Sequence, residues 1–299
     1  TGLENHRSHF ISLFDQVEQI LNAPATQDLL ARDSFDRADF IKLRNLPLSV
    51  MIGDIGYLNK YNEDPKIGLG HEGGNMILRE TGAVIKGLRP ADQAKGYRYA
   101  GDEFSMIIRQ PYLSAEDMVR ELQLKHSEIE IPGSDLPPMI NTGVAHVSEA
   151  ILAFMKLHPL AERKEMDTRA AAERISDLLT KIADLRAERA KREVRIFQMI
   201  SLFRESPDLL ARNMKWIYKG SGGLPVRQFE MSQEETEKLQ KFYLDELAGV
   251  ADGQKLNQLV NEFIDLSAEI DLDKDIERFR EEKSVLREIA GRPFYLANS

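Results

Sequence analysis

Apolar and polar positions alternate along the first part of the chain with the periods of helices and strands. Apolar side chains recur every three or four positions within residues 4–21, which predicts a helix. The compact apolar run 48–55, with Asp54 near its end, predicts a buried strand. Residues 70–89 return to the helical period and predict a second helix.

The segments that follow continue this alternation. The predicted elements are, in order, a hairpin at 97–110, a helix at 113–129, a strand at 137–149, a helix around 175–185 and a strand at 193–200. This succession of helices and strands predicts an α/β sandwich in which helices cover a mixed sheet.

Two stretches depart from the succession. Residues 22–46 are polar and are interpreted as an insertion with one short helix. A Gly- and Pro-rich break at 218–229 separates later helical patterns from the rest, so we expect a domain at 1–204 and a helical extension at 205–299. The apolar seam of this extension spans only two heptads, which favours a packed helical hairpin over a coiled coil.

Composition narrows the classes of function. The net charge of −9 and the sequence pI of about 5.3 argue against nucleic-acid binding, which needs a basic face, and leave a small phosphorylated ligand open. The absence of cysteine excludes disulfides and thiolate metal sites. The sequence has neither a membrane-spanning apolar window nor the apolar core of a signal peptide, so we expect a cytoplasmic protein without membrane insertion.

Two adjacent acids, Asp102 and Glu103, stand at the tip of the predicted hairpin. Turn chemistry alone accounts for Gly and Asp at such a tip. A metal site accounts for them as well, provided that another carboxylate lies nearby. If the strand that carries Asp54 is a neighbour of the hairpin, the three carboxylates meet at one edge of the sheet, and such hard oxygen ligands suit Mg²⁺ or Mn²⁺.

Six motifs follow one another along residues 1–195. They are TGLENHRSHF (1–10), DIGYLNKYN (54–62), GHEGGNMIL (70–78), RYAGDEF (98–104), NTGVA (141–145) and ADLRAERAKREVR (183–195). The series resembles the GGDEF family of diguanylate cyclases, which condense two GTP molecules into cyclic di-GMP. The resemblance implies a palm-like nucleotide-cyclase α/β fold for residues 1–204, and the all-helical extension falls outside it.

The resemblance also implies a catalytic centre. Asp54 and Asp102 match the family's metal ligands, with the carbonyl group of Ile55 as a further ligand. Glu103 matches the signature acid near the second metal ion and the attacking 3′-hydroxyl. These roles agree with the physics of the reaction, since an in-line attack on an α-phosphate depends on positioning and charge neutralisation.

Two cations match the family's triphosphate-binding pair. Lys191 and Arg195 are four residues apart and therefore lie on one helical face. An ordinary charged surface is an equally good interpretation of so basic a run. Lys60 lies beside Asn59, which stands where the family usually has a lysine, and is a further candidate for substrate binding.

Base recognition departs from the family pattern. Asn62 matches the residue that bonds guanine, but Asn75 replaces the guanine-reading aspartate. A carboxylate accepts from two guanine donors, whereas an amide offers one acceptor and one donor. An amide pairs bidentately with adenine instead. The expected substrate is therefore GTP, with ATP or a mixed dinucleotide product left open.

The family's product-inhibition motif corresponds to Arg89 and Asp92, at a longer spacing from the signature than usual. Because each family domain holds one nucleotide, the resemblance implies a homodimer for catalysis. Two other hypotheses stay open at this point. One is a degenerate domain that binds a nucleotide or a protein without turnover. The other is a structural module whose helical extension makes oligomer contacts.

Overall fold

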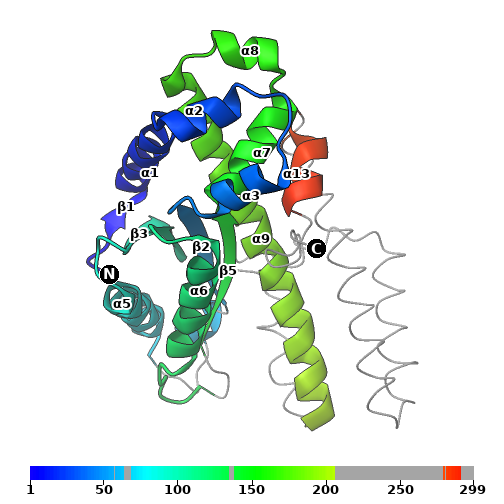
Figure 1. Ribbon diagram of the computed structural model, residues 1–299. Helices are drawn as coiled ribbons and strands as arrows, with labels where there is room; N and C mark the ends of the chain where they lie inside the picture. The colour runs from blue at the N-terminus through cyan, green and yellow to red at the C-terminus, as the bar shows by residue number, and fades with distance from the viewer. Residues whose placement is uncertain (57, 64–68, 135–137, 206–278, 280, 291–299) are drawn as a thin grey trace. The chain divides into compact units, whose positions relative to one another are not determined.

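The computed structural model (Figure 1) describes residues 1–56, 58–63, 69–134, 138–205, 279 and 281–290, and the side chains of 192–205 are not part of the description. The strands are β1 (Glu4–Asn5), β2 (Ser49–Gly56), β3 (Ala94–Ala100), β4 (Glu103–Ile108) and β5 (Met139–His146). The helices are α1 (His6–Leu21), α2 (Pro24–Leu30), α3 (Arg37–Arg44), α4 (Leu58–Glu63), α5 (His71–Leu88), α6 (Tyr112–Ser127), α7 (Val147–Leu157), α8 (Leu160–Glu165), α9 (Thr168–Glu205) and α13 (Lys283–Ala290).

The five strands form one sheet in the order β1-β3-β4-β2-β5. The short β1 runs parallel to β3, and every other pair in the sheet is antiparallel. The predicted mixed sheet flanked by helices is therefore confirmed. The predicted hairpin around Gly101 is the β3–β4 pair, and β2 lies between β4 and β5.

Each face of the sheet carries its own apolar core. Val50 and Ile107 belong to the core that α1, α7 and α9 cover. Met51 and Met106 belong to the core on the other face, beneath α5 and α6. Successive side chains of a strand point to opposite faces, so both cores draw on the same strands. This explains why β2 is mostly apolar on both faces: all eight of its residues are buried.

Gly143 on β5 lets α9 pack directly on the sheet. A methyl group added there would lie 2.0 Å from the carbonyl oxygen of Ala183 and 2.2 Å from the amide nitrogen of Ala187. Arg186 strengthens the same contact, because its guanidinium donates to the Val144 carbonyl and bidentately to Glu149 on α7. The backbone of α9 is thus held against β5 along Ala183–Ala187.

The structure corrects the prediction of a strand at 193–200, since α9 continues through this segment to Glu205. No glycine or proline stands between Thr168 and Glu205 to end the helix. The insertion 22–46 contains two short helices instead of one, and the second begins with a capping box between Asp36 and Asp39. The pattern also did not predict α7, which follows β5 directly.

The described C-terminal segment packs on residues of the first 191. Leu286 is fully buried in the core that α7 and α9 cover. Lys181 on α9 forms an ion pair of 2.6 Å with Glu282, and Arg186 donates to the carbonyl of Ile289 at 3.1 Å. The chain divides into one compact unit of Thr1–Lys191 with Leu272–Ser299 and another of Arg192–Asp271. The boundary at 204 stays a prediction, and the heptad seam lies outside the described residues.

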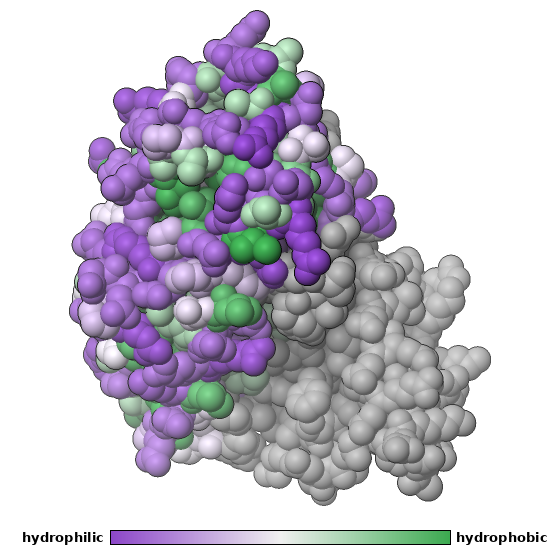
Figure 2. Space-filling model, in the orientation of Figure 1, coloured by the Kyte–Doolittle hydropathy of each residue, from purple (hydrophilic) through white to green (hydrophobic). Residues whose placement is uncertain are grey.

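None of the helices in the described ranges has the length and hydropathy needed to cross a membrane. The face of the molecule in Figure 2 is mostly hydrophilic, with hydrophobic side chains in small separate groups. Such scattered groups are usual for a protein surface and indicate no function by themselves.

Candidate active site

The predicted carboxylates lie on neighbouring strands at one edge of the sheet. Asp54 on β2 stands directly opposite Glu103 on β4 and opposite Asn141 on β5. Side chains of directly opposed residues share a face, so these three form a row across the central strands. This row lies on the face that α9 covers, since Gly143 contacts α9 and follows Asn141 by two residues.

The turn between β3 and β4 brings Asp102 to the same place. Gly101 adopts a φ of 27°, which a side chain would disfavour. Arg98 closes the turn from its own strand by donating to the Gly101 carbonyl at 3.0 and 2.6 Å. The amide of Ile55 donates to the Asp102 carbonyl at 3.4 Å, so the turn is joined to β2 immediately after Asp54.

Asp54 is a buried carboxylate held beneath α9. Only 7% of the residue is exposed, and its Oδ2 atom lies 3.2 Å from the ammonium of Lys191, which is itself 4% exposed. Burial raises the pKa of Asp54 to about 6, because desolvation outweighs the opposing attraction of Lys191. The nearby charge of Asp102 raises this pKa further.

The two signature acids share this electrostatic environment. Burial is the main cause that raises the pKa of Asp102 and also that of Glu103. Asp54 and Asp184 raise the pKa of Glu103 as well, whereas Lys191 lowers it. The site is therefore a group of partly buried acids beside Lys191, and it favours the binding of further positive charge.

The donor set fits a divalent cation bound together with a substrate. The Oδ1 atom of Asp54 is buried and has no hydrogen-bond partner among the described residues. Within those residues, no three His, Asp or Glu side chains gather closely enough to hold a metal ion by themselves. Mg²⁺ in phosphoryl-transfer enzymes is held by one or two carboxylates with substrate phosphates and water, so a closed cage of protein ligands is not needed.

The predicted base-binding residues lie around α4 and the start of α5. Asn62 accepts a hydrogen bond of 3.1 Å from the amide of Gly74 through Oδ1. Asn75, which follows Gly74 on α5, is exposed. Lys60 is buried at 1% exposure, whereas Asn75 is exposed. The structure thus brings Asn62 and the start of α5 together.

The two residues of the predicted inhibitory site, Arg89 and Asp92, differ in their contacts. Arg89 forms an ion pair of 2.6 Å with Glu121 on α6, while Asp92 is exposed in the turn before β3. Lys191 forms an ion pair with Asp54, and its predicted role in triphosphate binding stays a prediction. The side chain of Arg195 lies outside the described residues, so its role stays a prediction.

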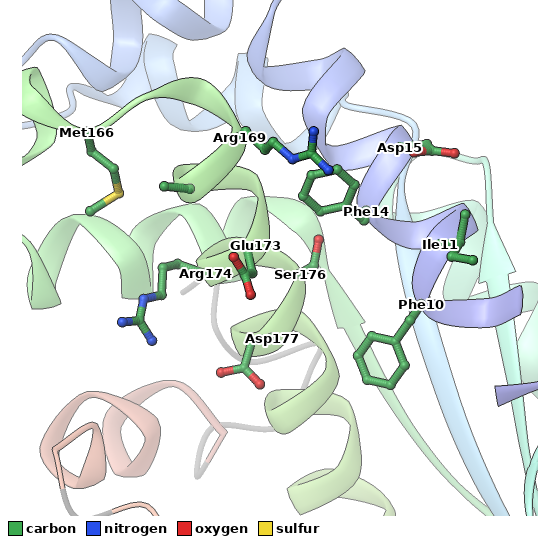
Figure 3. Close-up of a pocket in the computed structure, with 11 residues that line it drawn as sticks. Phe10, Ile11, Phe14, Asp15, Met166, Arg169, Glu173, Arg174, Ser176 and Asp177 are labelled. Carbon is green, nitrogen blue, oxygen red and sulfur yellow. The ribbon is translucent and has the colours of Figure 1, made fainter. Parts of the chain in front are cut away.

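A groove outside this group of acids lies between α1 and the first turns of α9 (Figure 3). Arg169 stacks on Phe14, with its guanidinium carbon 5.6 Å from the ring centre. Acidic and basic side chains alternate along the walls, including Asp15, Arg174 and Asp177. None of the predicted catalytic, metal-binding or substrate-binding residues is among those that line this groove.

Two residues near the acids, Asn141 and Asp184, were not predicted as site residues. Asn141 was quoted only as part of a motif, yet it directly faces Asp54. Asp184 was quoted in the same way, and its charge acts on Glu103 and on Tyr99, whose pKa burial raises to about 12. The signal that could have found Asn141 is its place on a strand that pairs with β2, which requires the strand order.

A family model described as "Diguanylate cyclase, GGDEF domain" matches residues 12–163, about half of the chain. The chain belongs to the GGDEF family. This GGDEF chain has no match among curated protein sequences.

Several solved GGDEF structures are similar to it. A sensory box/GGDEF family protein from Caulobacter crescentus is 19% identical, with 64% of this chain and 94% of that one covered and a TM-score of 0.42. The GGDEF domain of YfiN from Pseudomonas aeruginosa is 16% identical, with 55% and 92% covered and a TM-score of 0.36. The GGDEF domain of DgcB from Caulobacter crescentus, solved in complex with c-di-GMP, is 15% identical, with 56% and 90% covered and a TM-score of 0.38.

Proposed function

We propose that this GGDEF chain is a Mg²⁺-dependent nucleotidyl cyclase. It condenses two nucleoside triphosphates, GTP above all, into a cyclic dinucleotide such as cyclic di-GMP, and so acts in cyclic di-GMP signalling. One observation carries the proposal: the buried carboxylate of Asp54 lies in register with Glu103 and is joined through Ile55 to Asp102. Family membership supports the same activity.

Each acid has a role in this proposal. Asp54 and Asp102, with the carbonyl of Ile55, hold the divalent cation, and Glu103 lies near the attacking hydroxyl. When bound, Mg²⁺ or Mn²⁺ neutralises charge on the triphosphate and lowers the pKa of that hydroxyl. In each of two successive steps, the 3′-oxygen of one nucleotide forms a bond to the α-phosphorus of the other, the bond from that phosphorus to the bridging oxygen breaks, and pyrophosphate leaves. The raised pKa of Glu103 makes its carboxylate a better acceptor for the hydroxyl proton.

Lys191 binds the triphosphate in this proposal, together with Arg195. In the structure its ammonium neutralises Asp54. Binding of the cation and the nucleotide gives Asp54 and Lys191 new partners of opposite charge, so the buried charges stay compensated. Because one domain holds one nucleotide, the product forms between two copies of the chain, and the catalytic species is a homodimer.

A second function is a nucleotide-binding domain without turnover. The observation that favours it is Asn75, which is exposed at the start of α5 where the family has an acid. An amide leaves a guanine donor unpaired, at a cost of about 1–3 kcal/mol if that donor is buried. Such a domain would keep the fold and bind nucleotide but release no pyrophosphate.

Incubation of the whole chain with GTP, ATP, CTP and UTP in the presence of Mg²⁺, with mass spectrometry of the products, tests the proposal. A cyclic dinucleotide is expected from the wild type and none from Asp102→Ala. Asp117→Ala, which removes an exposed acid on α6, serves as the matched control and should form the product normally. Nucleotide binding without any cyclic product would support the second function. Asn75→Asp should shift preference toward GTP over ATP by about tenfold.

A further inference from the structure

Asn141 has a side chain whose polar oxygen is buried and unmatched. The residue is 3% exposed, and its Oδ1 atom has no hydrogen-bond partner in the part of the chain that the structure describes. A buried polar atom without a partner costs about 1–3 kcal/mol, and such atoms are rare in native proteins. An unmatched atom of this kind is a reason to look for a missing binding partner.

The position of Asn141 indicates what that partner is. It pairs in register with Asp54, whose Oδ1 atom is also buried and unmatched among the described residues. The two side chains share one face of adjacent strands, where the Cβ atoms of opposed residues lie about 5 Å apart. Two oxygen acceptors side by side cannot satisfy each other, because each needs a donor or a cation.

The amide nitrogen of Asn141 lies close to Gly56. A methyl group added at Gly56, farther along β2, would lie 3.4 Å from Nδ2. The nitrogen therefore faces Gly56, and the carbonyl end of the amide remains for the site. Carbonyl oxygens of Asn are ordinary ligands of hard divalent cations, alongside carboxylates.

We propose that Asn141 supplies its Oδ1 atom to the divalent cation that Asp54 holds. This inference rests on the proposed function, because it takes the site at Asp54 to bind a cation, and it adds a ligand that the family motifs did not assign. Asn141 contributes an oxygen without a charge, so it adds a ligand without adding repulsion to the three acids. The unmatched oxygen is then a stability cost that cation binding removes.

Titration of the whole chain with Mn²⁺ alone, followed by the electron paramagnetic resonance signal of free Mn²⁺, tests the proposal. Asn141→Leu should weaken Mn²⁺ binding about tenfold. Asn141→Asp should bind Mn²⁺ at least as tightly as the wild type, since the carboxylate supplies an oxygen with a charge. Thr142→Val is the matched control, because Thr142 lies on the opposite face of β5 and accepts from Gln123, and it should bind Mn²⁺ as the wild type does.

Thermal unfolding without metal separates this role from a structural one. If Asn141 is a ligand, Asn141→Leu removes an unmatched oxygen, and its Tm without metal should equal or exceed that of the wild type. If the amide instead donates to Asp54, the same variant should have a lower Tm, and that result would overturn the proposal. Unchanged Mn²⁺ affinity in Asn141→Leu would overturn it too.

The outcomes distinguish this inference from the proposed function. Loss of Mn²⁺ binding in Asp54→Asn with no change in Asn141→Leu refutes the role of Asn141 and leaves the cyclase proposal standing. Absence of Mn²⁺ binding in the wild type refutes both the ligand and a cation site formed without nucleotide, while the product assay still decides the cyclase activity.

Discussion

The ammonium of Lys191 lies 3.2 Å from a carboxylate oxygen of Asp54, and both side chains are almost fully buried. The lysine comes from α9 and the acid from β2, so this ion pair joins the helix to the central strand at the candidate active site. Burial of either charge without the other would lower the stability of the folded protein.

Removal of one partner should therefore be worse than removal of both. Lys191→Met raises the pKa of Asp54 above its present value of about 6, so the carboxyl group takes up a proton near neutral pH, and the free energy of unfolding should fall by about 1–2 kcal/mol. The double variant Asp54→Asn/Lys191→Met should recover much of this loss. Urea denaturation of the single and double variants measures both effects. Strict additivity of the two substitutions would show that the ion pair does not couple them.

Gly143 should not tolerate even a single added methyl group. Gly143→Ala places a carbon about 2 Å from the backbone of α9, and backbone atoms cannot move aside cheaply. The free energy of unfolding should fall by about 3 kcal/mol, and α9 should shift away from Asp54. The matched control is Gly87→Ala on α5, where an added methyl meets nothing within 4 Å. That control should stabilise the protein by about 0.5–1 kcal/mol, and equal effects of the two substitutions would refute the close packing of α9.

The described C-terminal helix should contribute to the stability of the GGDEF domain. Leu286 on α13 is fully buried, so Leu286→Ala should lower the free energy of unfolding by about 2–5 kcal/mol. Leu113→Ala removes the same group from a side chain that is 70% exposed and should change stability by less than about 0.5 kcal/mol. Chemical denaturation of the two variants measures these effects. An unchanged free energy of unfolding in Leu286→Ala would mean that α13 does not pack on the domain in solution.

Stability should fall steeply in mild acid because of three buried histidines. Burial lowers the pKa of His9, of His126 and of His146 to about 4 each, from an ordinary value of 6.5. Between pH 6.5 and about 4 these histidines bind protons in the unfolded chain but not in the folded chain. Their contribution to stability is therefore complete above pH 6.5 and is lost as the pH falls toward 4. The three groups together give a slope of about 4 kcal/mol per pH unit.

Asp54 acts in the opposite direction. Its pKa is raised from 3.8 to about 6, so protonation in mild acid relieves a penalty of about 1.4 kcal/mol per pH unit between those values. A net loss of stability is still expected below pH 6.5. Urea denaturation at pH 7.5, 6.0 and 5.0 measures it, and His9→Gln should reduce the slope by about a third of the histidine contribution. Equal stability at pH 7.5 and 5.0 would contradict the burial of these rings.

Much of the fold could be predicted because hydrophobic periodicity reports which positions are buried. The helices α1, α5 and α6, the hairpin around Gly101 and the strand with Asp54 all follow their patterns. The predicted strand at 193–200 was wrong because a short apolar run does not distinguish a strand from the continuation of a long helix, and no glycine or proline marks an end.

Only those residues of the candidate site that belong to a recognised motif could be predicted from the sequence. The proximity of Asp54 to the hairpin acids required a neighbouring pair of strands, and β2 does pair with β4. Local patterns contain no signal that β5 pairs with the other side of β2, so the place of Asn141 opposite Asp54 could not be inferred. The burial of Lys60 could not be predicted either, because the sequence of a single helical turn does not show which of its faces other elements cover.

The most direct measurement is the rate of pyrophosphate release from GTP and from ATP with Mg²⁺, compared among the wild type, Asp54→Asn and Asp117→Asn. Replacement of the buried carboxylate by an amide should reduce the rate by at least about 100-fold, because the site loses a charged ligand and keeps its shape. The exposed acid of Asp117 has no part in the site, so its variant should match the wild type. Equal rates in the wild type and Asp54→Asn, or no release from either nucleotide by the wild type, would contradict a catalytic role for this edge of the sheet.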